Sequence, residues 1–343
     1  MRILIDEFVT GGGWFHVEAN APSGSLLAEG RAMLAALAVD FAAIAGCSVD
    51  VLHDVRLART PLDRVTGHDV ESSLAERALL SRLAAQADWT VLIAPEFDRH
   101  LLERVKLVEG VGGRLLSPGS QVVALTADKH ATAEHLAARG VRVPRGIALG
   151  AGECLPDGFS YPAVLKPRDG AGSLGVRVVK SVDEPTVSQP SRLEAFCPGI
   201  AASVACLCGP REVVSLEPCV QHLAGHGDFT YQGGSLPIVS PLAERARALA
   251  VRAVSTLPQP RGYLGVDLVL GDDPAGSQDT VIEINPRLTT SYVGLRALSR
   301  VNLAGLMIAV AEGRDVELCW NASRVQFSSS GVCSVSSTGE TNS

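Results

Sequence analysis

The pattern of hydrophobic and polar positions in the first 115 residues alternates between two periods. Short runs of consecutive apolar residues, each long enough for one strand, are separated by longer segments with apolar residues every three or four positions. This alternation is typical of a parallel sheet covered by helices on both faces. The predicted strands are RILIDEFV, VDVLHDV, WTVLIAPE and RLLS, and the predicted helices are about 25–45, SSLAERALLSRLAAQA and LLERVKLVEG, with a polar loop after VDVLHDV.

The pattern changes after Ser117, where short strands predominate. TADKHATAEHLAARG first predicts a helix with Thr126 as its N-cap and Gly140 as the residue that ends it. Strands that pair as hairpins follow, around one further helix, AERARALAVRAVSTL. The last residues are rich in serine, glycine and threonine, so we expect the tail 321–343 to be disordered. The predicted strands are YPAVLKP, GVRVVK, LEAFCPG, AASVACLC, EVVSLEPCVQHL, GYLGVDLVLG and TVIEINP.

Composition limits the classes of partner. The 343 residues are 46% hydrophobic and 20% charged, which suits two or three globular subdomains. The net charge of −7, the absence of a Lys/Arg cluster and the 4% of aromatic residues disfavour nucleic acid. We find no signal-peptide pattern and no apolar run long enough to cross a membrane. We therefore expect a cytoplasmic protein that acts on small molecules.

Two features that could indicate cofactors give only weak signals. Cys206 and Cys208 share one face of a predicted strand, but no second ligand pair follows at zinc spacing, so we interpret the cysteines as small buried hydrophobes. Gly11–Gly13 does not have the GxGxxG spacing of a dinucleotide site, and a glycine hinge near a substrate pocket is the better interpretation. The histidines left as structural or surface residues are His16, His53, His68 and His226.

The stretch TVIEINPR places polar side chains in an apolar strand. If it pairs antiparallel with GVDLVLG around Ala275, Asp267 lies opposite Glu283, and Asn285 shares their face. Two carboxylates in an apolar setting repel each other unless a cation joins them, and all three side chains offer the oxygen ligands that Mg²⁺ prefers. The alternative is the solvated outer face of an edge hairpin. The loop GDDPAGSQD already supplies that polarity, which favours the metal site.

Two lysines and one glutamate could serve a nucleotide. Lys166 ends a strand just before RDGAGSLG, whose small residues allow backbone N–H groups to approach an anion, although the loop is not a Walker A motif. Alone, this loop could equally be a common β-turn. Lys129, early in its helix, is a weaker candidate, but together the lysines offer point charges for phosphates. Glu194, in an extended segment, could accept a hydrogen bond from an exocyclic amine of a base.

The order of these motifs resembles the ATP-grasp superfamily. The resemblance rests on DKH, KPRDGAGSLGV, EAFCPG followed by SV, GVDLVL and EINPR, and it covers about residues 115–315. It implies an α/β plus α+β fold, in which a Rossmann-like pre-ATP-grasp domain precedes a two-subdomain ATP-grasp fold. The expected divisions are 1–115, 116–190, 191–320 and the tail. The implied reaction forms an acylphosphate from a carboxylate and ATP, and an amine then attacks it.

The resemblance also implies roles for individual residues. Phosphate binding is assigned to Lys129, Lys166, Gly170, Gly172 and Ser173, adenine binding to Glu194 and the backbone of Ala195 and Cys197, Mg²⁺ (or Mn²⁺) binding to Asp267, Glu283 and Asn285, and catalysis to Arg287 and Lys166. One departure concerns the ribose. Many relatives have an acid just after the hinge glycine, whereas Gly199 is followed here by Ile200, so ribose recognition must come from elsewhere.

Within the superfamily, a second set of motifs resembles the tyramine–glutamate ligase group of methanofuran-type cofactor biosynthesis. These motifs are DEFVTGG, LLAEGRAML, DFTYQGGSLPI and EINPRLTTSYVGLR. The resemblance implies glutamate as the carboxylate and tyramine, tyrosine or a similar amine as the acceptor. Glu29 would meet the positive charge of the amine, although an exposed helix acid is an equal alternative. The substrate carboxylate would meet Arg287, Thr289, Thr290 and Ser291.

Several alternatives stay open at this level. Other ATP-grasp chemistry, such as glutamate-chain extension or carboxylation, is compatible with the motifs, although no biotin or carrier module is visible. A non-catalytic ATP-binding regulator would not need the metal-binding acids. The pattern does not fix the oligomeric state, and a homodimer is one compatible assembly.

Overall fold

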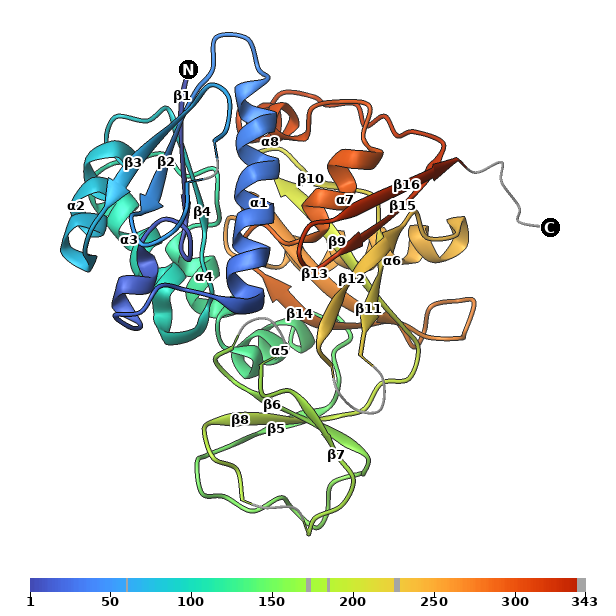
Figure 1. Cartoon of the computed structure of the whole chain (residues 1–343). Coiled ribbons are helices and arrows are strands. Elements are labelled where there is room, and N and C mark those ends of the chain that lie inside the picture. Colours follow the sequence, from blue (N-terminus) through green and yellow to red (C-terminus); the bar gives the residue numbers. More distant parts are fainter. Residues whose placement is uncertain (60, 171–173, 184–185, 225–228, 338–343) are drawn as a thin grey trace.

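The computed structural model describes residues 1–59, 61–170, 174–183, 186–224 and 229–337, and these form three sheets (Figure 1). The first sheet is parallel, with strand order β3-β2-β1-β4. The second is antiparallel, in the order β5-β8-β6-β7. The third runs β14-β13-β9-β11-β12-β15-β16, with β10 also paired to β9. No helix in the described ranges is both long and apolar enough for a membrane span.

The N-terminal domain is a parallel sheet between helices, as its sequence pattern predicts. Apolar residues on one face of β1 and β2 pack with α1, and those on the other face pack with α2 and α3. A parallel sheet needs this double cover because both of its faces are apolar. The elements are β1 (Arg2–Glu7), η1 (Gly13–His16), α1 (Gly24–Ala42), β2 (Ser48–Asp54), β3 (Val65–Val70), α2 (Ser73–Ala84), β4 (Trp89–Ile93), η2 (Phe97–Arg99) and α3 (His100–Gly110).

Strand β3 was not predicted, because its sequence VTGHDV is mostly polar. It pairs in parallel with β2 at the edge of the sheet, and only Val70 is fully buried. An edge strand needs few apolar residues, so the polar loop expected there is wrong over residues 65–70. The predicted strand RLLS is reduced to a single parallel bridge between Leu115 and Thr90.

The three glycines after β1 form a tightly packed turn within the N-terminal domain. Gly12 has a φ of +94°, and a Cβ on Gly13 would lie 2.3 Å from the Phe8 ring. All three are buried, and none lines the cavity described below. The hinge expected beside a substrate pocket is therefore wrong, because close packing and backbone conformation, rather than mobility, require glycine here.

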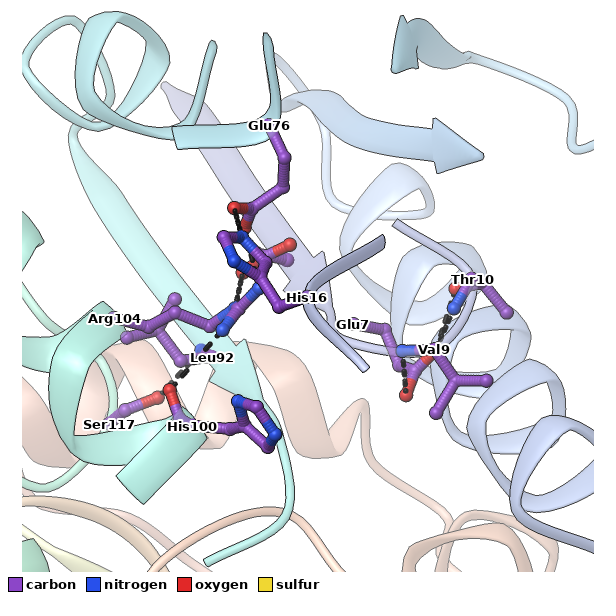
Figure 2. A network of polar contacts seen from close by, with 10 residues as sticks. Glu7, Val9, Thr10, His16, Glu76, Leu92, His100, Arg104 and Ser117 are labelled. Carbon is purple, nitrogen blue, oxygen red and sulfur yellow. Dashed lines mark hydrogen bonds and ion pairs between the residues drawn. The ribbon is translucent and has the colours of Figure 1, made fainter. Parts of the chain in front are cut away.

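A buried polar network supports this turn (Figure 2). Arg104 of α3 lies between two acids, with Nε 3.2 Å from Asp6 Oδ2 and Nη2 2.7 Å from Glu76 Oε1. His16, just after the glycines, places Nε2 3.0 Å from Glu76 Oε2. Burial, opposed by Arg104, raises the pKa of Asp6 to about 7. These contacts join β1, α2 and α3 into one rigid unit.

The middle part of the chain forms a small antiparallel sheet next to two helices. One α-helical segment was predicted from Thr126, but one helix ends at Thr126 and a second helix starts at Lys129. The N-cap is Asp128, whose side chain accepts hydrogen bonds from the N–H groups of His130 and Ala131. The Thr126 hydroxyl instead donates to a carbonyl oxygen of the preceding helix. Gly140 ends the helix as predicted, with a φ of +72°. The elements are α4 (Ser120–Thr126), α5 (Lys129–Ala137), β5 (Gly146–Leu149), β6 (Ala163–Pro167), β7 (Arg177–Val179) and β8 (Ser191–Ala195).

The large sheet of the C-terminal part carries helices on both faces. Helix α6 packs on one face, where Cys206 and Cys208 are fully buried as small hydrophobes, as predicted. Helices α7 and α8 pack on the other face and share one apolar core with α1 of the N-terminal domain. The elements are β9 (Ile200–Cys208), β10 (Val213–Ser215), β11 (Cys219–Leu223), β12 (Tyr231–Leu236), α6 (Ser240–Ser255), β13 (Gly262–Leu270), β14 (Thr280–Asn285), α7 (Ser291–Leu298), α8 (Leu303–Ala311), β15 (Ser323–Ser328) and β16 (Cys333–Ser337).

The C-terminal residues 323–337 are ordered, in contrast to the predicted disordered tail. Strand β15 adds to β12 and turns back through Gly331 into β16. Val325 and Phe327 alternate with polar residues and are only 1% and 2% exposed. The serine-rich composition concealed this alternation, which is the pattern of a half-buried strand. Residues 338–343 lie outside the described part of the chain.

This hairpin gives a direct test of the fold. Replacing Phe327 by alanine should lower the free energy of unfolding by about 3–5 kcal/mol, because it leaves a cavity beneath α7. Val332, in the same hairpin, is 70% exposed, and its replacement by alanine should change that free energy by less than about 0.5 kcal/mol. Urea unfolding measures both, and equally small effects would indicate that the hairpin does not dock.

Candidate active site

The hairpin of β13 and β14 brings the predicted metal-binding side chains together. Asp267 pairs with Glu283, and Gly265 pairs with Asn285, as the sequence predicted. Asn285 Nδ2 donates to Asp267 Oδ2 at 3.0 Å, and Gln221 Nε2 of β11 donates to Asp267 Oδ1 at 2.9 Å. The face is half-buried, with Asp267 and Glu283 both partly exposed, rather than the freely solvated outer face of the alternative interpretation. It lines a cavity with walls from all three parts of the chain.

The charge of this face is incompletely compensated. Burial and then repulsion from Glu283 raise the pKa of Asp267 to about 6. Asp267 is met by two carboxamides rather than by a cation. No three His, Cys, Asp or Glu side chains in the described ranges form a metal site by themselves. Two carboxylates and the carboxamide of Asn285 fit a hard cation such as Mg²⁺ that keeps several water or phosphate ligands.

Both predicted lysines reach this hairpin from the other subdomain. Lys129, at the start of α5, places Nζ 2.5 Å from Glu283 Oε1 and 2.7 Å from the carbonyl oxygen of Gly170. Burial lowers the pKa of Lys129, but the adjacent Glu283 raises it by more. Lys166, at the end of β6, donates to the carbonyl oxygen of Ile282 at 3.1 Å. The lysines therefore hold the hairpin while lying at the cavity wall.

Two predicted phosphate-binding residues cannot be placed. Gly170 lines the cavity, but Gly172 and Ser173 lie outside the described residues. On either side of that gap, Gly170 and Leu174 both belong to the cavity wall.

Glu194 lies at the end of β8, where the chain crosses from the small sheet to the large one. It is 3% exposed, with Oε1 2.6 Å from Lys166 Nζ and Oε2 2.7 Å from Arg192 Nε. Both oxygens are thus already engaged by cations. Ala195 and Cys197 follow along the cavity wall, as predicted for an adenine contact. The N–H of Ala195 donates to the carbonyl oxygen of Arg145, and its carbonyl oxygen accepts from Cys197 Sγ at 3.7 Å.

The opposite end of the cavity holds the predicted substrate residues. Thr289 Oγ1 lies 2.8 Å from Ser291 Oγ and 3.2 Å from Tyr263 OH. Hydrogen bonds among these three hydroxyl groups fix their positions. Thr290 lines the same wall. Glu29 reaches this end from α1, and burial raises its pKa, with Arg287 acting in the opposite direction.

Arg287 is buried between acids. Its Nε lies 3.0 Å from Glu96 Oε1. Burial lowers the pKa of Arg287, but Glu96, and then Glu29 and Glu283, raise it by more. Glu96 follows β4 of the N-terminal domain and was not predicted, because nothing near it in the sequence indicates a partner 191 positions away. Gln221 was missed as well, because a lone polar residue in a strand is common.

Tyr231 and Phe229 complete the apolar wall near Glu29 and Asp267. They belong to the segment DFTYQGG, which the sequence singled out as a motif without a role for these rings. Burial raises the pKa of Tyr231 far above its usual range. The cavity therefore combines cations, oxygen ligands, and aromatic and acidic side chains.

Comparison with known proteins agrees with this architecture. A family model described as an ATP-grasp domain matches residues 126–291, and one described as a pre-ATP-grasp domain matches residues 47–124. The tyramine–L-glutamate ligase of Methanocaldococcus jannaschii is 24% identical over 248 residues, 71% of this chain and 69% of that protein.

Solved structures share the fold. An ATP-grasp superfamily protein from Archaeoglobus fulgidus has a TM-score of 0.70 at 24% identity and covers 95% of this chain and 92% of its own. An ADP complex of N5-carboxyaminoimidazole ribonucleotide synthetase has a TM-score of 0.70 at 20% identity, over 95% of this chain and 81% of that one. The chain therefore contains a pre-ATP-grasp domain followed by an ATP-grasp domain, and it has the fold of an ATP-grasp superfamily protein.

Proposed function

We propose that this ATP-grasp ligase joins a carboxylate of L-glutamate to tyramine, tyrosine or a similar amine, with cleavage of ATP to ADP and phosphate. The observation that carries the proposal is the meeting of Lys129, Lys166, Arg287 and the Asp267–Glu283–Asn285 set in one cavity. Phosphoryl transfer needs little beyond positioned cations and a metal; this arrangement offers the cations and the oxygen ligands that would hold the metal. The choice of substrates rests on the likeness to the tyramine–L-glutamate ligase.

The nucleotide end would work by exchange of partners. Lys129 and Lys166 are paired with glutamates, and phosphate oxygens would compete for the same ammonium groups. Release of Glu283 from Lys129 would free it, with Asp267 and Asn285, to hold Mg²⁺, or Mn²⁺ in its place. The metal would supply neutralisation of phosphate charge. The carbonyl of Ala195, near Cys197, would accept from the adenine amine.

The chemical steps would take place at the boundary between the two ends. A substrate carboxylate oxygen would attack the γ-phosphorus and displace ADP, while Arg287 stabilises the charge on the transferring group. The amine nitrogen would then attack the acyl carbon, and phosphate would leave as the amide forms. Thr289, Thr290 and Ser291 would orient the carboxylate substrate. Glu29 would bind the ammonium group of the amine before it loses its proton.

The first test is the reaction itself. Purified protein with ATP, Mg²⁺ and glutamate should release ADP only when a suitable amine is added, and mass spectrometry should detect the amide. Tyramine and tyrosine are the first amines to compare. ADP release that ignores the amine would exclude this ligation, release with glutamate alone and growing products would indicate chain extension, and release that requires bicarbonate would indicate carboxylation.

A second test addresses the metal. Glu283→Gln and Asp267→Asn should each lower kcat by about 100-fold or more and raise the Mg²⁺ concentration needed for half-maximal activity. Chelation of divalent ions should stop the wild-type reaction, and Mn²⁺ should restore it. Asp272→Asn, at an exposed position of the same hairpin, is the matched control and should leave both quantities unchanged. An unchanged Mg²⁺ requirement in both site variants would contradict the assignment.

A third test addresses the adenine end. Cys197 lines the cavity, so ATP with Mg²⁺ should slow its alkylation by iodoacetamide at least about tenfold when the site is saturated. Burial raises the pKa of this thiol, so the labelling is best done at mildly alkaline pH. The exposed Cys154 provides an internal control, because its rate should not change. Equal rates at Cys197 with and without nucleotide would place the base elsewhere.

A further inference from the structure

The segment 95–99 of the N-terminal domain contacts both parts of the ATP-grasp domain. The Glu96 side chain lies on Arg287, just beyond the metal-binding hairpin. Two residues later, the N–H of Asp98 donates to Asp169 Oδ2 at 3.0 Å. Asp169 directly precedes Gly170, whose carbonyl oxygen accepts from Lys129 Nζ. One short segment therefore contacts Arg287 directly and, through Asp169, the residue next to the carbonyl group that binds Lys129.

The contact between Glu96 and Arg287 is electrostatic and loosely aligned. Glu96 is 3% exposed, and the two side chains approach to 3.0 Å at Oε1 and Nε and to 3.4 Å at Oε2 and Nη2. Neither Oε1 nor Nε makes a well-aligned hydrogen bond within the described structure. Nη1 of Arg287 also donates to the carbonyl oxygen of Leu288 at 3.2 Å. These contacts fix the place of the guanidinium and leave its remaining N–H groups for an anion.

Without Glu96, Arg287 would have other acids to move toward. Glu29 and Glu283 both act on its charge. In the proposed function these two glutamates serve the amine and the metal, so an arginine drawn onto either would be displaced and would also block that partner. The charge of Glu96 prevents this. Glu96 does not belong to the cavity wall; its side chain contacts Arg287, and its charge reaches Lys129 more weakly than the charge of Glu283 does.

The backbone around Glu96 is held in an unusual conformation. Asp98 and Arg99 have φ values of +51° and +60°, in the left-handed region that side-chain-bearing residues rarely adopt. Surrounding contacts fix it. The N–H of Leu101 donates to the carbonyl oxygen of Pro95 at 3.1 Å, and the centroids of the His100 and Phe8 rings lie 4.5 Å apart. Strain of this kind persists only where the surroundings impose it, and it often accompanies a functional constraint.

We propose that Glu96 is a positioning residue, through which the pre-ATP-grasp domain holds Arg287 at the transferring phosphoryl group. The proposal rests on the role of Arg287 in the proposed function. It assigns the N-terminal domain a part in the chemistry itself, beyond its contribution of Glu29 to the amine. Phosphoryl transfer should then depend on an acid that touches neither nucleotide nor substrate.

The test uses ADP with aluminium fluoride, which mimics the transferring phosphoryl group. Glu96→Gln should weaken binding of ADP with aluminium fluoride about 10- to 100-fold and leave binding of ADP alone within about twofold, both measured by calorimetry in the presence of Mg²⁺. Glu96→Asp should recover part of the loss. In an Arg287→Lys background, Glu96→Gln should cost less than about threefold, because its effect passes through the arginine.

Asp40 provides a matched control. It is a buried acid of the same domain, on α1, with Oδ1 2.7 Å from Arg296 Nη2 of α7. Asp40→Asn removes an ion pair between the same two parts of the chain, so it should lower the unfolding midpoint without selective loss of aluminium fluoride binding. Equal weakening of both ligands by Glu96→Gln, or full additivity with Arg287→Lys, would overturn the proposal. These readouts need no amine, so failure of the ligation assay leaves them decisive.

Discussion

Charge pairing in a cavity shielded from water is the constraint on which the site depends. Each of three cations at or beside the cavity is matched to a glutamate from a different element, and each pair joins two parts of the chain or two adjacent strands. A buried charge without a partner is costly, so the pairs keep the parts together when no ligand is present. The pairs are Lys129 with Glu283, Lys166 with Glu194, and Arg287 with Glu96.

Two acids at the cavity have no such cation. Asp267 accepts hydrogen bonds from two carboxamides. Glu29 acts on the charge of Arg287 less strongly than Glu96 does. The cavity is thus short of positive charge at the two places where the proposed function adds it, with a metal at one and an ammonium group at the other. In the proposed function, anionic phosphates would take over lysines that are already present and would release their carboxylates.

The sequence predicted the parts of the site that depend on local pairing and missed those that depend on distant contact. The register of Asp267 and Glu283 followed from strand period and turn position alone. Glu96 could not be found in this way, since its meaning comes from Arg287, far along the chain.

The fold shows the same division between what a local pattern reveals and what it conceals. Alternation of strand and helix patterns predicted the parallel sheet, yet the edge strand β3 and the hairpin of β15 and β16 were hidden by polar composition. In both, a few buried side chains decide the structure, and average composition does not report them. The N-cap of α5 was predicted at Thr126 but is Asp128, because threonine and aspartate are both common capping residues.

The register of the hairpin contains one irregularity with consequences for how this site can change in evolution. Asp267 pairs with Glu283 but Leu268 pairs with Val281, so Ile282 is an additional residue, a β-bulge. Outside the regular ladder, its carbonyl oxygen accepts a hydrogen bond from Lys166. Loss of this single residue would join the two halves of the strand into a regular ladder, with Asp267 still opposite Glu283, but would remove the carbonyl oxygen that accepts from Lys166. Deletion of Ile282 would therefore leave the two acids opposite each other, whereas deletion of Ile284 would place Glu283 and Asn285 on opposite faces of the strand.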